Sequence, residues 1–240
     1  MSEEIKRDIF EIRFFPVPAF FSRKSDLIEL LYRDAKTKQN NFEHWQLTED
    51  RVTLFDEDKR RLYQISYKNI AYSIIQPATE NYARDQIQKY FGLTADHFED
   101  KIEKIQRVGF RQTRVITIKD FDEVKDQIVK NFIKTDNAVF QAVGNQIADV
   151  QVFPTVFKHG ANRFQITLGP AMKDQLKILW GSDWEFPEQA LFVDVDYFAV
   201  EPRIPNNDLK GYVAEFIAKA KDIQSKVFPE VSETILYNPR

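Results

Sequence analysis

The order of strand-like and helix-like segments is the feature that most constrains the fold of this chain. A β-rich run at residues 9–15 is followed by a helical pattern, by short strands over 42–75, and by helical spacing over 82–105. The same order then returns: a strand, a helix after Asp120, further strands, and an amphipathic helix from about Asp208. An antiparallel sheet that packs one face against helices accounts for this order.

We therefore predict an α+β fold built from two β-α-β(3-4)-α units, residues 1–105 and residues 106–240, packed as one compact unit. The antiparallel sheet or sheets are predicted to be covered on one face by long amphipathic helices. Identity between the two halves is negligible, so the internal duplication is inferred from element order alone. Function is expected on the face that the helices leave free.

Local patterns give finer predictions. Gly92 followed by Thr94 is predicted to divide the helical segment into two helices, because glycine ends helices and threonine begins them. Alternation over residues 61–67 places Tyr63, Ile65 and Tyr67 on one side of a strand. This aromatic side is expected to form a groove, a cavity or a dimer contact, with a large core as the alternative for the many aromatic residues. The strands expected in the second half are 108–118, 139–143, 149–157, 163–169, 176–180 and 191–200.

Composition indicates a globular protein and narrows the chemistry. The chain has 240 residues, 43% of them hydrophobic, which is enough to bury a sizeable core. It has no cysteine, so disulfides, thiolate metal sites, iron–sulfur clusters and thiol nucleophiles are excluded. This fits a reducing, cytoplasmic location. The charged start MSEEIKRD is not typical of a secretory signal, and no apolar run is long enough for a membrane span.

The charge balance does not favour nucleic acid as a partner. Residues 1–105 contain 17 Lys and Arg against 19 Asp and Glu, and residues 106–240 contain 17 against 18. A protein that binds by neutralising phosphates usually carries a basic excess, which neither half has. The same balance argues against an anionic membrane surface.

The chain lacks the common signatures of cofactor and metal enzymes. It contains no GxGxxG, no GxxxxGK[ST], no HExxH and no GxSxG. Its three histidines, His44, His97 and His159, stand far apart, and a solvated or hydrogen-bonded role is expected for each. No cofactor and no metal are therefore expected. One acidic pair is a weak candidate for a metal site.

That pair is Asp194 and Asp196, two residues apart in the strand FVDVDYF and so on the same side of it. Two close carboxylates either raise the pKa of one of them or attract a cation. They could bind Mg²⁺ or Mn²⁺, or divide acid and base roles, in a phosphoesterase or nuclease. Alternatively, they form the polar face of an amphipathic strand, neutralised by Arg or Lys from a neighbouring strand.

The strongest basic cluster is Arg107, Arg111 and Arg114. In a regular strand Arg107 and Arg111 share one face and Arg114 points the other way. Two arginines can hold one phosphate or carboxylate through paired N–H groups. They can equally pair with Asp194 and Asp196, if that strand lies alongside, as a structural charge ladder. Both interpretations stay open from the sequence.

The same segment carries a family resemblance. RVGFRQTRVI, after a helix ending EDKIEKIQ, resembles the R-[IVL]-G-[LF]-R strand of a sporadically distributed, functionally uncharacterised family of bacterial proteins of about this length. IFEIRFFPVP, RVTLFDEDKRRLYQIS, LFVDVDYF and DIQSKVFPEVSETIL resemble that family's opening strand, middle hairpin, late D-x-D strand and C-terminal end. One departure is that Gln112, Thr113 and Arg114 stand where the family has an Asn. The resemblance implies a bacterial intracellular protein and no particular activity.

Three hypotheses for function follow. The leading one is a non-enzymatic binding or protein-interaction module that self-associates or docks a protein partner through the aromatic sheet face or the last helix. The second is a metal-assisted phosphoesterase or nuclease that uses Asp194 and Asp196, with Arg107 or Arg111 on the phosphate. The third is a carrier of a small apolar ligand.

Overall fold

The computed structural model describes residues 4–34, 36–79, 81–98, 102, 104–133, 150, 153–180, 184–204 and 208–237. The first half contains β1 (Glu4–Phe14), α1 (Ala19–Tyr32), β2 (His44–Leu47), β3 (Arg51–Phe55), β4 (Arg61–Ser66), β5 (Asn69–Ile75) and α2 (Tyr82–Phe98). The second half contains β6 (Ile105–Thr117), α3 (Phe121–Phe132), β7 (Phe153–His159), β8 (Asn162–Met172), α5 (Lys173–Trp180), β9 (Gln189–Val200), α6 (Leu209–Ser232) and the π-helical turn η3 (Glu233–Tyr237).

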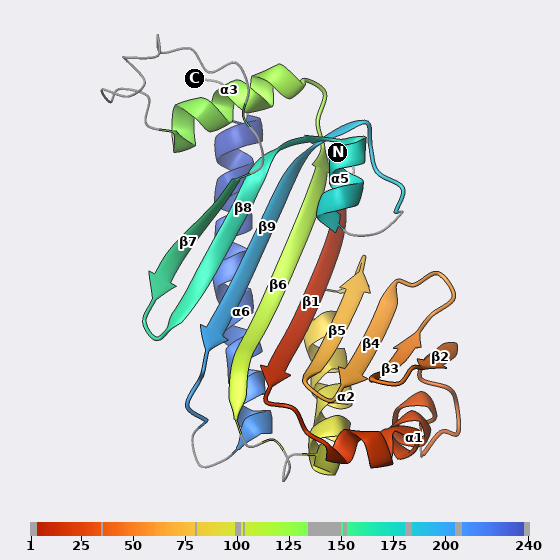
Figure 1. Ribbon diagram of the computed structural model, residues 1–240. Helices are drawn as coiled ribbons and strands as arrows, with labels where there is room; N and C mark the ends of the chain where they lie inside the picture. The colour runs from red at the N-terminus through yellow and green to blue at the C-terminus, as the bar shows by residue number, and fades with distance from the viewer. Residues whose placement is uncertain are drawn as a thin grey trace.

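All the strands of the described part of the chain join one antiparallel sheet, shown in Figure 1. The strand order is β2-β3-β4-β5-β1-β6-β9-β8-β7, so β1 and β6 form the centre. The α+β class and the antiparallel sheet are as predicted. The fold is thus one sheet to which both halves of the chain contribute.

The order within the sheet is the same for the two halves. In the first half β1 pairs with β5, the last strand, and β4, β3 and β2 follow toward the edge. In the second half β6 pairs with β9, the last strand, and β8 and β7 follow toward the other edge. The first strands, β1 and β6, pair antiparallel with each other. Two copies of one β-α-β(n)-α unit joined through their first strands would give this order. The duplication itself stays a prediction, and α5, between β8 and β9, has no counterpart between β4 and β5.

Helices α2 and α6 lie behind the sheet in Figure 1. Phe10 and Phe110, which face each other across β1 and β6, are fully buried in one core cluster with residues of both helices. Their neighbours along the strands alternate to the opposite side of the sheet. We call the side of Phe10 and Phe110 the covered face and the opposite side the open face.

A short helix, α5, lies at one end of the open face. Leu176 and Trp180 of α5 are buried with Val115 and Phe192, which belong to the open face by the strand alternation. The Arg7 Nη1 donates to the Trp180 carbonyl oxygen at 2.6 Å, which ties the end of α5 to β1. The rest of the open face carries no helix in the described part of the chain.

Several local predictions are confirmed and others are wrong. The helices predicted after Asp120 and from about Asp208 are confirmed as α3 and α6, and both aspartates cap their helix by accepting from the backbone N–H groups of Glu123 and Gly211. Residues 176–180, predicted as a strand, belong to α5, because a short apolar run has no periodicity that separates strand from helix. The strand expected at 139–143 lies outside the described residues.

Gly92 does not divide the helix before β6. Helix α2 continues through Gly92 and Thr94, and the Thr94 hydroxyl donates to the carbonyl oxygen of Tyr90 inside the helix. The same hydroxyl lies 2.8 Å from the Tyr63 hydroxyl, and both side chains are fully buried. Thr94 therefore joins α2 to β4 instead of starting a new helix.

The expectation of a free aromatic face is also wrong. Tyr63 and Ile65 of β4 are buried on the covered face, and Tyr63 packs against Tyr72 and Tyr90. Large rings gain the most from burial, so the helices cover the side of the sheet that carries them. The open face is left with mostly polar and charged side chains.

Candidate functional site

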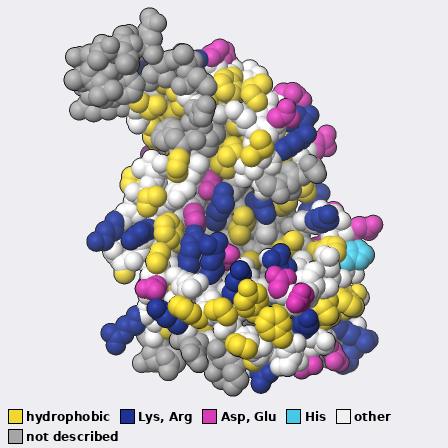
Figure 2. All heavy atoms as spheres, in the orientation of Figure 1, with side chains coloured by type: hydrophobic (Ala, Val, Ile, Leu, Met, Phe, Trp, Pro, Cys, Tyr) yellow, Lys and Arg dark blue, Asp and Glu magenta, His cyan; other side chains and the backbone are white. Residues whose placement is uncertain are grey.

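Arginines gather on the middle of the open face. Figure 2 shows Lys and Arg side chains over the central strands, with acidic side chains among them. Strand alternation and the Cα partners assign five arginines and three carboxylates to the open face of β1, β6, β9 and β8, namely Arg7, Arg13, Arg107, Arg111, Arg163, Glu11, Asp194 and Asp196. The local excess of positive charge contrasts with the net charge of −3 of the whole chain.

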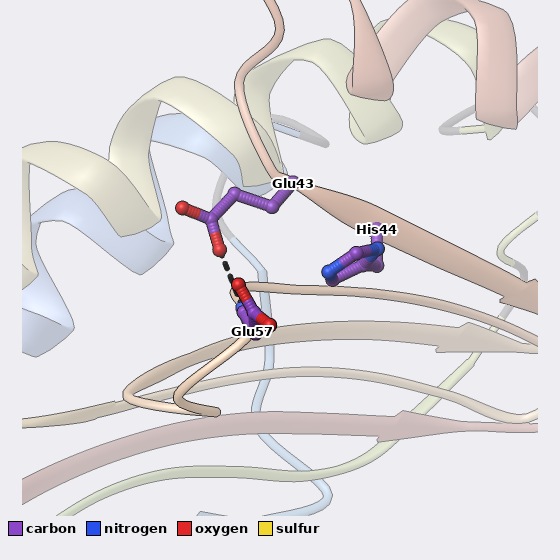
Figure 3. A group of neighbouring side chains, drawn as sticks. All are labelled: Glu43, His44 and Glu57. Atoms are coloured by element: carbon purple, nitrogen blue, oxygen red, sulfur yellow. Dashed lines mark hydrogen bonds between the residues drawn. The ribbon is translucent and has the colours of Figure 1, made fainter.

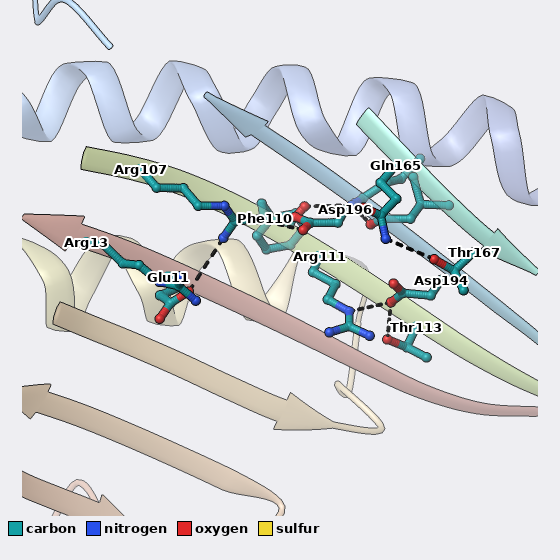
Figure 4. Close-up of polar contacts among 12 residues, drawn as sticks. Glu11, Arg13, Arg107, Phe110, Arg111, Thr113, Gln165, Thr167, Asp194 and Asp196 are labelled. Atoms are coloured by element: carbon teal, nitrogen blue, oxygen red, sulfur yellow. Dashed lines mark hydrogen bonds and ion pairs between the residues drawn. The ribbon is translucent and has the colours of Figure 1, made fainter. Parts of the chain in front are cut away.

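Asp194 holds Arg111 in place. The Arg111 Nε donates to Asp194 Oδ1 at 2.6 Å, and the Thr113 hydroxyl donates to the same oxygen at 2.6 Å (Figure 4). The Asp194 side chain is only 3% exposed, whereas the Arg111 side chain is 40% exposed. A buried carboxylate therefore fixes one edge of a guanidinium group whose other edge faces solvent.

Asp196 and Glu11 hold a second arginine between them. The Arg107 Nη2 donates to Asp196 Oδ2 at 2.5 Å, and its Nη1 lies 3.5 Å from Glu11 Oε2. Glu11 also pairs with the Arg13 Nη2 at 2.8 Å. The guanidinium group of Arg107 lies over the ring of Phe198, 4.9 Å from its centre. Arg107 thus has both terminal nitrogens engaged, unlike Arg111.

These side chains surround a groove of about 410 Å³, which we call the arginine groove. Its lining comes from β1, β6, β8 and β9: Ile9, Glu11, Arg13, Arg107, Gly109, Arg111, Gln165, Asp196 and Phe198. Gly109 makes room for Arg107, because a Cβ at that position would lie 2.7 Å from the Arg107 Nη1. Arg107 can therefore keep this position only because residue 109 has no side chain.

The Gly109→Ala variant is expected to lose about 1 kcal/mol of unfolding free energy, because the new methyl group displaces Arg107 from Asp196. Urea denaturation followed by circular dichroism measures the loss. Gly92→Ala is the matched control, since a Cβ there meets no atom of the described residues within 4 Å and alanine favours the interior of α2. Equal stability changes of the same sign in the two variants would contradict the assigned role of Gly109.

The charges around the arginine groove shift the pKa values of Arg7 and Asp196. Burial lowers the pKa of Arg7, the charge of Arg111 lowers it further, and Asp194 acts in the opposite direction. Burial also raises the pKa of Asp196, against the effect of Arg107, and the charge of Asp194 adds to the increase. An added anion beside Arg111 would relieve the repulsion between Arg111 and Arg7.

The structure brings together the residues predicted from the sequence. Arg107 and Arg111 share the open face with Asp194 and Asp196, and each arginine pairs with one aspartate. Arg114 lies on the covered face, as a regular strand requires. The charge-ladder interpretation describes these pairs, and the anion-binding interpretation is compatible with them because the two terminal nitrogens of Arg111 donate to no described residue.

Three arginines of the open face were missed from the sequence: Arg7, Arg13 and Arg163. Arg7 lies between Lys6 and Asp8, and Arg13 and Arg163 are each flanked by uncharged residues, so none of them belongs to an arginine cluster in the sequence. The alternation of β1, in which Arg7, Glu11 and Arg13 share one side, was the available signal. The contribution of Arg163 depends on β8 lying next to β9, which no local pattern reveals.

The geometry at Asp194 and Asp196 does not favour a metal ion. A divalent cation between the two carboxylates would lie against the guanidinium groups of Arg107 and Arg111, which already neutralise them. Among the described residues, one group of side chains has ligand atoms close enough for a metal: Glu43, His44 and Glu57 (Figure 3). All three are exposed, at the β2 edge of the sheet, and Glu43 already accepts from the Glu57 backbone N–H at 2.5 Å.

The core offers little space for an apolar ligand beside α1. A cavity between α1 and the ends of β1, β4 and β5, lined by Phe14, Phe20 and Ile65 among others, has a volume of about 10 Å³. This is about the space of one water molecule. The cavity therefore cannot hold an apolar metabolite. No helix of the described residues has the length and hydrophobicity to cross a bilayer.

Comparisons with known proteins add no family to these observations. No protein-family model matches the chain, and no curated protein matches it. The resemblance to the bacterial family with the R-[IVL]-G-[LF]-R strand stays a prediction. The candidate site therefore has to be interpreted from its own geometry.

Proposed function

We propose that this protein is a binding module that docks an acidic segment of a partner protein in the arginine groove. The observation that carries the proposal is the state of Arg111. Asp194 binds its Nε, and the two terminal nitrogens donate to no group in the part of the chain that the structure describes. A guanidinium group held in this way is prepared to bind a carboxylate through two parallel N–H groups.

The charges around Arg111 support an anionic partner. Five arginines and three carboxylates share the open face of β1, β6, β9 and β8, and the charge of Arg111 contributes to the lowered pKa of Arg7. Arg163 is exposed on β8, beside Phe198 on β9. A carboxylate of the partner would be attracted by the excess charge and selected by the fixed position of Arg111.

Apolar side chains next to the arginines support a protein partner. Figure 2 shows hydrophobic side chains gathered below the basic patch, toward the end of the sheet where α1 begins. Phe15, directly after β1, is 46% exposed, and Phe21, in the first turn of α1, is 47% exposed. Interfaces between proteins combine aromatic anchors and arginines in this way. A peptide with acidic and aromatic residues therefore fits both parts of the surface.

The proposal is tested with a labelled peptide of alternating glutamate and phenylalanine, by fluorescence anisotropy. The wild-type protein is expected to bind it, and Arg111→Gln is expected to raise the Kd about tenfold by removing a charge-assisted pair of hydrogen bonds. Raising the salt concentration is expected to weaken binding to the wild type.

Two controls make the experiment decisive. Arg84→Gln removes a half-exposed arginine of α2, behind the sheet, and is expected to leave the Kd unchanged. A peptide with lysine in place of glutamate is expected not to bind. If Arg84→Gln and Arg111→Gln have the same effect, or if the lysine peptide binds as well, the arginine groove is not the docking site.

A further inference from the structure

A second groove lies on the covered face, between the middle of β1 and β6, helix α6, and residues 77–79 before α2. Its volume is about 430 Å³. Asp8 and Gln112, which line it, are Cα partners across β1 and β6 and lie on the same side as Phe10 and Phe110. This groove is therefore separated from the arginine groove by the sheet itself.

The floor of this groove consists of two buried side chains. Asp8 is 0% exposed, and its Oδ1 accepts from the Gln112 Nε2 at 2.7 Å. Gln224 of α6 is 1% exposed, and its Nε2 donates to the carbonyl oxygens of Phe110 and Val195 at 3.2 and 3.1 Å. Because both amide hydrogens are used on the strands, Oε1 is the acceptor end of the Gln224 side chain.

Two acceptors on this floor are without a donor. Neither Asp8 Oδ2 nor Gln224 Oε1 accepts a hydrogen bond from any described residue. The Lys221 Nζ lies 3.9 Å from Asp8 Oδ2, beyond hydrogen-bond distance. A buried acceptor, and above all a carboxylate oxygen, is costly to leave in this state. A ligand group that donates several hydrogen bonds would remove the cost.

The wall of the groove carries positively charged side chains that donate hydrogen bonds. The Arg114 Nη1 lies 3.3 Å from a Glu4 carboxylate oxygen, and its Nη2 donates to Gln112 Oε1 at 3.4 Å. The guanidinium group lies 4.0 Å from the centre of the Phe228 ring, which fixes its plane. Its Nε is buried and donates to no acceptor among the described residues. Lys6 and Lys221 add positive charge to the same groove.

We propose that this groove binds a small zwitterion of the α-amino-acid class. The ammonium group of the ligand donates to Asp8 Oδ2 and Gln224 Oε1, and its carboxylate accepts from the Arg114 Nε and faces the two lysines. A primary ammonium group has three donors and no acceptor, which suits a floor of two orphaned acceptors. A zwitterion brings no net charge, whereas a metal ion would add charge beside Arg114 and Lys221.

The experiment measures the melting temperature of the full chain with each of the common α-amino acids, followed by calorimetry for those that stabilise it. At least one free amino acid is expected to raise the melting temperature in a concentration-dependent way. Its N-acetyl form, which lacks the ammonium group, and simple alkylamines, which lack the carboxylate, are expected to have no comparable effect.

Two variants assign the binding to the groove. Asp8→Asn is expected to weaken the affinity about tenfold or more, because it removes the charged partner of the ammonium group. Arg114→Gln is expected to weaken it about tenfold through the carboxylate. Asp222→Asn, on the exposed rim of the groove, and Arg111→Gln, on the open face, are expected to leave it unchanged. Circular dichroism establishes that each variant is folded.

Several results would overturn the proposal. It fails if no free amino acid stabilises the protein, or if the N-acetyl forms or the alkylamines stabilise it equally. It also fails if folded Arg114→Gln and folded Asp8→Asn both keep the wild-type affinity. Because Arg111→Gln tests the open face separately, failure here is distinct from failure of the docking function.

Discussion

Replacing Asp194 by asparagine is expected to lower the free energy of unfolding by about 2 kcal/mol. The carboxylate accepts from both Arg111 and Thr113, and asparagine keeps an acceptor for them but removes the negative charge. Arg111 and Arg7 would then repel each other without their common counter-ion. Removing one partner of a fully buried ion pair costs about 3–5 kcal/mol, and the exposed side of Arg111 reduces that figure.

The sign of this change separates two interpretations of Asp194 and Asp196. Carboxylates placed together to bind a cation repel each other, so removing one charge stabilises the cation-free protein. Carboxylates that neutralise arginines stabilise the fold, and removing one charge destabilises it. Urea denaturation of the purified protein in the presence of a chelator therefore decides between the ladder and the phosphoesterase hypothesis.

Two further variants control this measurement. Asp58→Asn, in an exposed pair with Arg60, is expected to change stability by less than about 0.5 kcal/mol. The double variant Asp194→Asn with Arg111→Gln is expected to lose less than the sum of the single variants, because the two side chains interact. Additive losses would mean that the contact between Arg111 and Asp194 contributes nothing to stability.

Replacing Asp8 by asparagine is expected to have the opposite effect, raising the free energy of unfolding by about 2 kcal/mol at pH 7. Burial is the main cause that raises the pKa of Asp8, and it exceeds the opposing effects of Gln112, Lys221 and Arg114. Asparagine keeps the acceptor for Gln112 and removes the buried charge. The ligand-free variant is thus more stable while its affinity for an ammonium group is lower.

The effect of Asp8 depends on pH in a defined direction. Because its pKa is higher in the folded state, the folded protein binds its proton more tightly than the unfolded chain does. The stability contributed by this proton is complete below the unfolded pKa and is lost as the pH rises through the folded one. The advantage of Asp8→Asn is therefore expected to be small near pH 4, to grow with pH, and then to level off.

Urea denaturation of both proteins from about pH 4 to about pH 8 measures this dependence. The contribution of Asp196, whose pKa is also raised, is the same in both proteins and cancels in the difference. Asp222→Asn, whose carboxylate is exposed beside Lys226, is expected to show no such trend. A difference between Asp8→Asn and wild type that shrinks with rising pH would show that Asp8 is stabilised as an anion.

Much of the fold followed from sequence periodicity, because strand alternation and helix spacing are local. Alternation also placed Arg107 with Arg111, and Asp194 with Asp196, on one side of their strands. That the two pairs meet depends on β9 lying next to β6, with Arg111 opposite Asp196 in the register. Strand order is a long-range property, so the sequence left the ladder as one of two alternatives.

The groove on the covered face escaped the sequence analysis, although two signals were present. Asp8 precedes Phe10, Ile12 and Phe14 at the spacing of an inward-facing row, so a charge interrupts an apolar stripe. Gln224 interrupts the stripe of α6 between Ala220 and Phe228 in the same way. A polar residue on an apolar stripe indicates a buried polar contact, but its partner on another element cannot be read from either stripe.

The position of the arginine groove across the central strand pair has a thermodynamic consequence. Glu11 and Arg13 come from β1, in the first half of the chain, and Arg107 and Arg111 come from β6, in the second. The groove exists only while these two strands are paired, so binding energy gained there opposes their separation. A bound partner would therefore make the two halves unfold more cooperatively. Its largest stabilising effect would be on the pairing of β1 with β6.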